Sequence, residues 1–322
     1  MKALRYHALG GPEVLVWEEI PDPDVRAGDV LIKVAAAGVN FADLLRRQGQ
    51  YTMTEPLPVT LGVEAAGTVV SVGSDVRDIQ PGDRVLCRAR GCQAELVAAP
   101  ANGVNRIPDR LAFEEAAAIP VNFLTAYHML RTLSPVRPGD AVLVQAAASG
   151  VGTAAVQLAK LWGARVLATA SNGEKLGLAK RLGADAGINY TRQDFLAEVL
   201  ARTDNRGVDR VLECVGGDVL TRSVKALAPG GVLMIYGRAS GTLPPLSPEE
   251  FFPKNLRVFG VHIGMPPWTN EIHKAALEEI IRLTVGGKIR PVIDRTFPLQ
   301  EAARAHEHLE QRKTMGKVLL IP

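Results

Sequence analysis

The sequence predicts an α/β protein of two domains, one mostly β and one built on a doubly wound parallel sheet. The 322 residues are enough for two hydrophobic cores. Short apolar or alternating runs broken by turns occupy the first 120 residues, and strand and helix patterns alternate from Pro138 onward. These two textures follow each other along the chain, so each predicts its own domain.

The N-terminal part has the pattern of a compact, mostly antiparallel β unit. Its strand-like runs are VLIKVAAAGVN, AAGTVVSVG, DRVLC and AELVAA, and turn signals such as RAGD, SVGSD and QPGD separate them. At Phe113 the pattern changes to a helical stretch, FEEAAAIPVNFLTAYHML, in which Pro120 predicts a break.

From Pro138 the chain alternates between buried strands and helices. The strand-like runs are AVLVQ, ARVLATA, VDRVLEC, VLMIY and RVFGVHI, and the helices are expected at 151–162, 174–182 and 218–227. Such a βαβ series predicts a doubly wound parallel sheet. Near Met265–Pro267 the pattern changes again, to an amphipathic helix over 272–285 and a closing strand, KVLLIP.

Composition excludes several classes of partner. The formal charge is only +3 and no basic block is present, which argues against nucleic-acid binding. No run approaches 18 apolar residues, and the N-terminus lacks a signal-peptide pattern, so no membrane span or export is expected. The three cysteines (Cys87, Cys92 and Cys214) lack disulfide-like spacing, which favours the reducing cytoplasm.

A loop of small residues joins a strand to a helix in VLVQAAASGVGTAAVQLAK. Ala147, Ser149 and Gly152 stand where a dinucleotide-binding fingerprint has its three glycines. A pyrophosphate must approach the backbone closely and is stabilised by N–H groups at a helix N-terminus, so we expect it on residues 149–152, which are Ser149, Gly150, Val151 and Gly152. The alternative is a packing turn, but the surrounding strands and helices favour cofactor binding.

The next strand ends in TASNGEK, which indicates the kind of cofactor. NAD enzymes place an acid at this point to bind the ribose hydroxyls, whereas NADP enzymes offer hydroxyls or cations to the 2′-phosphate. Ser171 stands at the position of the acid, and Lys175 follows on the next helix. A solvated surface lysine is the alternative for Lys175, but the missing acid predicts NADPH.

Several motifs together resemble a known family. GVNFADLLRRQGQY, LPVTLGVEAAGTVVSVG, PGDRV, FEEAAAIPVNFLTAY, AAASGVG, INY and GKVLLIP occur in the order typical of the zinc-independent, zeta-crystallin-like quinone oxidoreductases of the medium-chain dehydrogenase/reductase (MDR) superfamily. The resemblance covers essentially the whole chain. It implies a GroES-like substrate domain over residues 1–124, completed by 265–322, and a Rossmann NADPH-binding domain over 125–264.

The zinc-dependent members of the superfamily differ at the metal site. The resemblance places Asn40, Val63 and Val121 at the positions of their Cys, His and Cys ligands, and a valine cannot bind a metal. Cys87 and Cys92 do not make a four-cysteine lobe. We therefore expect no metal, and an acceptor that is already electrophilic, because no Lewis acid polarises it.

The resemblance also assigns site residues. Tyr51 and Asn40 are the expected catalytic residues: Tyr51 would donate a hydrogen bond or proton, or would only stack on the nicotinamide, while Asn40 would bind substrate or nicotinamide ribose and Asp43 would brace the loop. Further residues are expected at the cofactor, with Tyr127 beside Thr125 at the domain junction: Thr125, Tyr190, Gly237, Arg238, Val261, His262 and Lys317.

The predicted function is an NADPH-dependent, metal-free reductase of quinones or other activated alkenes and carbonyls. Two alternatives stay open: an enoyl-thioester (2-enoyl-CoA or ACP) reductase, and an NADPH-binding structural or vesicle-associated protein with little turnover. A homodimer is expected through the edge strand 257–263, because a bare β-branched edge favours pairing and relatives pair it with its twofold mate.

Overall fold

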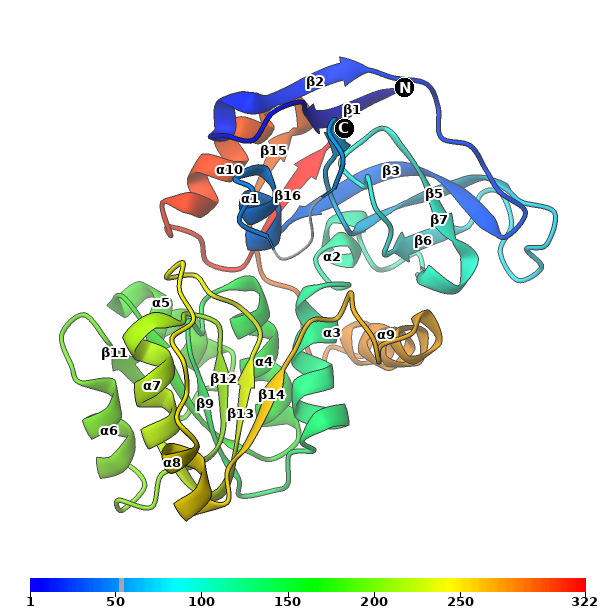
Figure 1. Cartoon of the computed structure of the whole chain (residues 1–322). Coiled ribbons are helices and arrows are strands. Elements are labelled where there is room, and N and C mark those ends of the chain that lie inside the picture. The colour runs from blue at the N-terminus through cyan, green and yellow to red at the C-terminus, as the bar shows by residue number, and fades with distance from the viewer. Residues whose placement is uncertain (52–54) are drawn as a thin grey trace. The chain divides into compact units, whose positions relative to one another are not determined.

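The computed structural model describes residues 1–51 and 55–322. The chain divides into two compact units, which are drawn in Figure 1. Unit 1 comprises Met1–Leu124 and Pro266–Pro322, and unit 2 comprises Thr125–Met265. The predicted α/β fold, a GroES-like β domain plus a Rossmann domain, is confirmed.

Unit 1 is built on a seven-stranded sheet in the order β15-β16-β3-β5-β6-β8, with β7 paired to β3, and on a three-stranded sheet in the order β2-β1-β4. Its strands are β1 (Lys2–Tyr6), β2 (Leu15–Glu19), β3 (Asp29–Val39), β4 (Val59–Thr60), β5 (Ala65–Val72), β6 (Arg84–Cys87), β7 (Leu96–Pro100), β8 (Val104–Arg106), β15 (Ile293–Pro298) and β16 (Lys317–Ile321). Its helices are α1 (Phe41–Arg47), α2 (Phe113–Ala117), α9 (Asn270–Val285) and α10 (Ala302–Glu310).

The pairing of β16 with β3 joins the two ends of the chain. The strands run antiparallel, with Val318 opposite Val39 and Leu320 opposite Ala37. Alternate residues of β3, among them Val30, Ile32 and Val34, are buried in the core of the unit. This register brings the first residue of β16, Lys317, to the point where β3 ends and Asn40 begins helix α1.

Unit 2 contains a six-stranded parallel sheet in the order β11-β10-β9-β12-β13-β14. Its strands are β9 (Ala141–Val144), β10 (Arg165–Ala170), β11 (Ala186–Asn189), β12 (Val208–Glu213), β13 (Leu227–Ile235) and β14 (Arg257–Gly260). Helices flank this sheet on both sides (Figure 1). They are α4 (Gly150–Leu161), α5 (Gly173–Arg181), α6 (Phe195–Ala201), α7 (Gly217–Lys225) and α8 (Pro248–Phe251), while α3 (Asn122–Tyr127) leads into the unit.

The order of the strands fixes where a ligand would bind this sheet. β9 and β12 are neighbours, yet the chain proceeds from β9 to β10 in one direction and from β12 to β13 in the other. Ligands of open α/β sheets bind at the carboxyl ends of the strands at this kind of reversal. The loops after β9, β10, β13 and β14 therefore form the expected binding edge.

Most predicted elements are confirmed, and three of unit 2 escaped prediction. The helical stretch from Phe113 is broken around Pro120 into α2 and α3, as expected. Strand β11, helix α6 and the four-residue helix α8 were not predicted, and the edge strand is shorter than the expected 257–263. Within the described residues, no helix is long and apolar enough to cross a membrane.

Candidate active site

The glycine-rich loop of unit 2 ends in a capped helix. Ser149 is the N-cap of α4, and its Oγ accepts a hydrogen bond from the Gly152 N–H at 3.0 Å. A Cβ at Gly152 would lie 2.3 Å from the carbonyl oxygen of Ala146, so only glycine fits. The helix therefore begins against the backbone of the loop, with its positive end at the carboxyl edge of the sheet.

Buried hydrogen bonds fix the loop to the neighbouring strand. The Ala147 N–H donates to the Thr169 carbonyl at 3.0 Å, and the Thr169 hydroxyl donates to Gln145 Oε1 at 2.6 Å. Gln145 Nε2 in turn donates to Ser223 Oγ at 3.1 Å. This rigid cradle of small residues at a helix N-terminus fits a dinucleotide pyrophosphate.

The corner after β10 holds three of the predicted cofactor residues. Asn172 caps α5 through a hydrogen bond from the Lys175 N–H to its Oδ1, 2.9 Å long. The Ser171 carbonyl accepts from the Thr191 hydroxyl at 3.2 Å, and the Tyr190 N–H donates to the Ala170 carbonyl at 3.2 Å. Ser171, Lys175 and Tyr190 thus flank one corner, which carries a hydroxyl, an ammonium and an aromatic ring suited to an adenosine 2′-phosphate.

The other predicted cofactor residues of unit 2 follow its last two strands. Gly237 and Arg238 come after β13, and Val261 and His262 come after β14, which pairs with β13. The Val261 N–H donates to the Ile235 carbonyl at 2.8 Å, so the backbone after β14 stays against β13. Thr125, at the start of this unit, is buried. The roles of these residues stay predictions.

Unit 1 contains a buried polar cluster at the junction of β3, β5 and β16, which we call the Asn40 cluster and define as Asn40, Glu64 and Lys317. The ammonium of Lys317 donates to Glu64 Oε1 and, at 2.7 Å, to Asn40 Oδ1. Asn40 Nδ2 donates to Glu64 Oε1 at 2.8 Å. The exposed fractions are 9% for Asn40, 0% for Glu64 and 2% for Lys317, so all three are buried and Asn40 is the least buried.

Asp43 supports the Asn40 cluster from helix α1. Its Oδ2 accepts hydrogen bonds from the Asn40 N–H at 2.8 Å and from Gln93 Nε2 at 3.4 Å. Burial raises the pKa of Asp43 to about 6, against the lowering effect of the Asn40 hydrogen bond and the nearby cations. The bracing role expected for this residue agrees with the contact, which holds the backbone at the start of α1.

Tyr51 lies just after α1, and the guanidinium of Arg46 packs over its ring. The guanidinium carbon of Arg46 is 4.8 Å from the ring centroid, and Arg46 also pairs with Glu55 at 3.3 Å. Burial raises the pKa of Tyr51, so its hydroxyl keeps its proton at neutral pH. Of the loop around it, Thr52, Met53 and Thr54 lie outside the described residues.

Two of the site residues predicted from sequence, Asn40 and Lys317, are brought into contact here. The ammonium of Lys317 is engaged within unit 1, and its expected contact with the cofactor stays a prediction. Glu64 was missed as a site residue. Its signal was an acid inside the apolar run LGVEAAGTVV, where burial requires a partner.

The zinc that the wider fold family carries does not fit these residues. Val63 and Val121 offer no metal-binding side chain, and the Val121 N–H donates to Glu64 Oε2 at 2.7 Å. In the part of the chain that the structure describes, no group of three or more His, Cys, Asp or Glu residues could hold a metal ion. We therefore derive no step through a metal.

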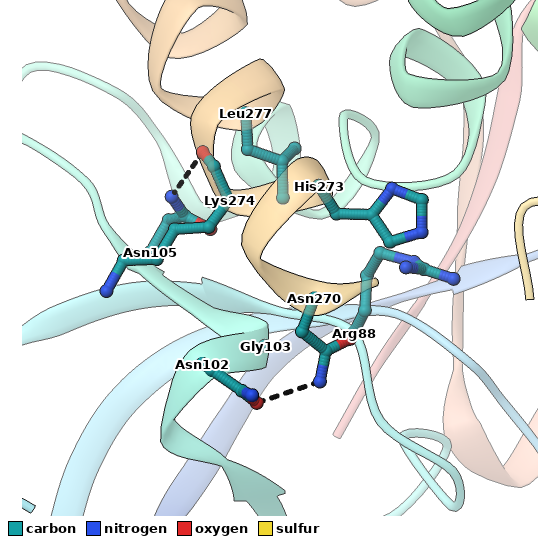
Figure 2. Close-up of a pocket in the computed structure, with 8 residues that line it drawn as sticks. All are labelled: Arg88, Asn102, Gly103, Asn105, Asn270, His273, Lys274 and Leu277. Carbon is teal, nitrogen blue, oxygen red and sulfur yellow. Dashed lines mark hydrogen bonds between the residues drawn. The ribbon is translucent and has the colours of Figure 1, made fainter. Parts of the chain in front are cut away.

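A separate small pocket of unit 1 lies where α9 meets β8, and no predicted site residue lines it (Figure 2). Asn105 Nδ2 donates to the Lys274 carbonyl at 3.2 Å, and Asn270 Nδ2 donates to Asn102 Oδ1 at 2.8 Å. These bonds tie the helix to the β structure, so the pocket belongs to the packing of the unit.

Comparison with known proteins places the chain among relatives of similar length. Residues 26–109 match the family described as "Alcohol dehydrogenase GroES-like domain", and residues 150–282 match "Zinc-binding dehydrogenase". A quinone oxidoreductase of Pseudomonas aeruginosa is 36% identical, with 100% of this chain and 99% of the relative covered. A 2-haloacrylate reductase of a Burkholderia species is 34% identical, with 98% and 97% covered. The crystal structure of Escherichia coli quinone oxidoreductase complexed with NADPH superposes with a TM-score of 0.95 at 34% identity, covering 100% of both chains.

Proposed function

The chain belongs to the quinone oxidoreductase branch of the MDR superfamily, and on that premise we propose that it is a metal-free NADPH:quinone or enone reductase. It is an oxidoreductase, and NADPH is its cofactor. The observation that carries the metal-free proposal is the Asn40 cluster, in which an ammonium and an amide contact Glu64, while the other two ligand positions hold Val63 and Val121. Its substrate is a small molecule.

Bound NADPH supplies a hydride, and the chain must then stabilise the charge that arrives on the acceptor. A quinone or an enone delocalises that charge onto oxygen, so a hydrogen-bond donor near the oxygen accelerates the reaction. Unit 1 offers the Tyr51 hydroxyl and the Asn40 amide as such donors. One proton completes the reduced product, and it comes from the Tyr51 hydroxyl or from water, because the Asn40 carboxamide can donate a hydrogen bond but not a proton.

Conjugated alkenes fit the same chemistry, and one relative supports them. The Burkholderia relative is named a 2-haloacrylate reductase, which acts on an activated alkene. An enoyl thioester is activated in the same way, so the enoyl-thioester reductase is the second candidate. A binding protein with little turnover is the third.

Assays of NADPH absorbance with a naphthoquinone, a simple enone and crotonyl-CoA separate these functions. We expect the quinone or the enone to be reduced, and the rate to survive prolonged EDTA treatment. Faster reduction of crotonyl-CoA would favour the enoyl-thioester reductase as the function. Tight NADPH binding without any turnover would favour an NADPH-binding protein. Stoichiometric zinc in active protein would contradict the metal-free proposal.

Replacing Lys175 by alanine should raise the Michaelis constant for NADPH and barely change that for NADH. A hydrogen bond to a charged group contributes about 1.5–3 kcal/mol, which corresponds to roughly 10- to 150-fold in affinity. Solvent at this corner should screen the contact toward the lower figure. Steady-state kinetics with both cofactors measure the change.

Ser171→Asp is the companion variant, because it adds a carboxylate where the 2′-phosphate would bind. It should raise the Michaelis constant for NADPH more than Lys175→Ala does. The ratio of kcat/KM for NADH to that for NADPH should increase. Equal effects of Lys175→Ala on both cofactors, or equal use of NADH and NADPH by the wild type, would show that this corner does not select the phosphate.

A homodimer is part of the proposal. β14 is an edge strand, and its Val258 is 41% exposed, which leaves an apolar residue on an unpaired edge. Light scattering should give twice the chain mass of 34.5 kDa, and Val258→Asp should shift the protein toward the monomer. A wild-type monomer at micromolar concentration would contradict this pairing.

We also place the protein in the cytoplasm. Cys87, Cys92 and Cys214 are all free thiols, which supports a reducing compartment. Fractionation of the cells that make the protein would test this location.

A further inference from the structure

The Asn40 cluster determines the orientation of one carboxamide. An amide side chain has an oxygen that accepts hydrogen bonds and a nitrogen that donates two. Lys317 can only donate, and it contacts Asn40 Oδ1 at 2.7 Å; Glu64 as a carboxylate can only accept, and it contacts Nδ2 at 2.8 Å. Flipping the amide would place nitrogen against the ammonium and oxygen against the carboxylate, so both contacts would become repulsive.

The two charged partners are themselves held in place. Glu64 accepts from Lys317 through Oε1 and from the Val121 N–H through Oε2. A Cβ at Gly38 would lie 2.5 Å from Glu64 Oε1, so the strand leaves room for this carboxylate only because residue 38 is glycine. Lys317 is fixed by the pairing of β16 with β3.

The backbone of Asn40 is fixed as well. Its N–H donates to Asp43 Oδ2 at 2.8 Å within the capping box of α1. One N–H of the side-chain nitrogen is used by Glu64. The second has no acceptor paired with it among the described residues, and Asn40 is the least buried member of the cluster.

A buried ion pair does not by itself explain why Lys317 and Glu64 occupy this position, because it adds little to the stability of a fold. Taking two charges out of water costs free energy, and well-packed apolar residues often stabilise a fold as much or more. What an ammonium and a carboxylate provide here, and apolar residues would not, is a donor on one side of the amide and an acceptor on the other.

We propose that Lys317 and Glu64 are positioning residues that hold the Asn40 carboxamide in one orientation, with its second N–H presented to the acceptor oxygen that becomes anionic on hydride transfer. This inference rests on the proposed reductase function. It assigns Glu64 and Lys317 an indirect role in turnover, exerted through Asn40.

The test exchanges the charge between two positions. Asn40→Asp places a second carboxylate against Glu64, so we expect lower thermal stability and lower kcat. In the double variant Asn40→Asp/Glu64→Gln the net charge returns to that of the wild type. Lys317 then gives up its contact with position 64, where the new amide nitrogen would face it, and pairs with the new carboxylate at position 40. The new amide at position 64 donates to the same carboxylate, and its oxygen can still accept from the Val121 N–H. Position 40 now accepts hydrogen bonds and cannot donate one.

The double variant should recover part of the thermal stability that Asn40→Asp loses, because a donor at position 64 replaces the repelling carboxylate. Its kcat should stay about 10²–10³-fold below the wild type, as for loss of an oxyanion donor. The matched single variant Glu64→Gln keeps the Asn40 donor but lets the amide turn, so its loss of kcat should be smaller.

Two results would overturn the proposal. If kcat recovers together with stability, residue 40 does not need to donate. If thermal stability does not recover at all, opposed donor and acceptor groups are not what holds residue 40. The stability measurement needs no turnover, so it decides the arrangement even if the wild type reduces no acceptor, a result that would refute the reductase function instead.

Discussion

Replacing Tyr51 by phenylalanine should lower kcat by about 10²–10³-fold, the usual cost of removing a donor to a developing oxyanion. Affinity for NADPH should change much less, because the ring remains. The change removes one oxygen from a half-buried side chain, so the thermal unfolding midpoint should stay close to that of the wild type. Stopped-flow kinetics and direct NADPH titration measure these quantities separately.

The structure explains why the hydroxyl is available as a donor. Burial raises the pKa of Tyr51 while the Arg46 cation opposes the rise, so the phenol is protonated throughout the neutral range. Arg46 lies over the ring at 4.8 Å and pairs with Glu55, which fixes the ring beside α1.

Arg46→Gln is a useful companion to Tyr51→Phe. It keeps the hydroxyl and removes the cation from the ring, so we expect a smaller loss of kcat than in Tyr51→Phe. An unchanged rate in Tyr51→Phe would leave stacking on the cofactor as the better account of this residue. A loss confined to the Michaelis constant for NADPH would lead to the same conclusion.

The sequence predicted most of the fold because its signals are local. The strands of unit 2 are β-branched runs next to capped helices, and the strand, loop and helix around Gly152 are contiguous in the chain. The elements of unit 2 that were missed are short. β11 and α8 have four residues each and α6 has seven, so each is shorter than the window over which a hydrophobic period can be recognised.

The candidate site was predicted only in part because half of it depends on distant pairs. Asn40 and Lys317 are 277 positions apart, and Glu64 and Lys317 are 253 apart. Only the strand register of β16 on β3 makes them neighbours, and periodicity does not reveal a register between strands so far apart. Lys317 was therefore predicted to reach the cofactor, with no sign of its ion pair.

Another buried group, His306, makes the protein sensitive to acid. His306 lies on α10 with 0% of its surface exposed, and neither ring nitrogen has a hydrogen-bond partner among the described residues. Burial, helped by the nearby Arg47 cation, lowers its pKa to about 3 from the usual 6.5. The folded protein therefore keeps this imidazole neutral in mildly acidic solution.

Because of His306, the free energy of unfolding should decrease as the pH falls from 6.5 toward 3. In that window the unfolded chain binds a proton on this imidazole and the folded chain does not, so the free energy of unfolding falls by about 1.4 kcal/mol per pH unit. Asp43 acts in the opposite direction, because its folded pKa of about 6 lies above the ordinary value of 3.8 and favours the folded state as the pH falls.

The measurement must therefore compare two proteins at each pH. His306→Leu keeps a side chain of similar size and removes the proton acceptor, while Asp43 is common to both proteins and cancels. From urea unfolding at pH 7.5, 6 and 5, the stability of His306→Leu relative to the wild type should rise as the pH falls. Between pH 6 and pH 5 the rise should be about 1 kcal/mol, because the unfolded imidazole is only partly protonated at pH 6. A difference that does not vary with pH would mean that the folded protein binds this proton as readily as the unfolded chain, through a rearrangement of α10 that lets water reach the ring.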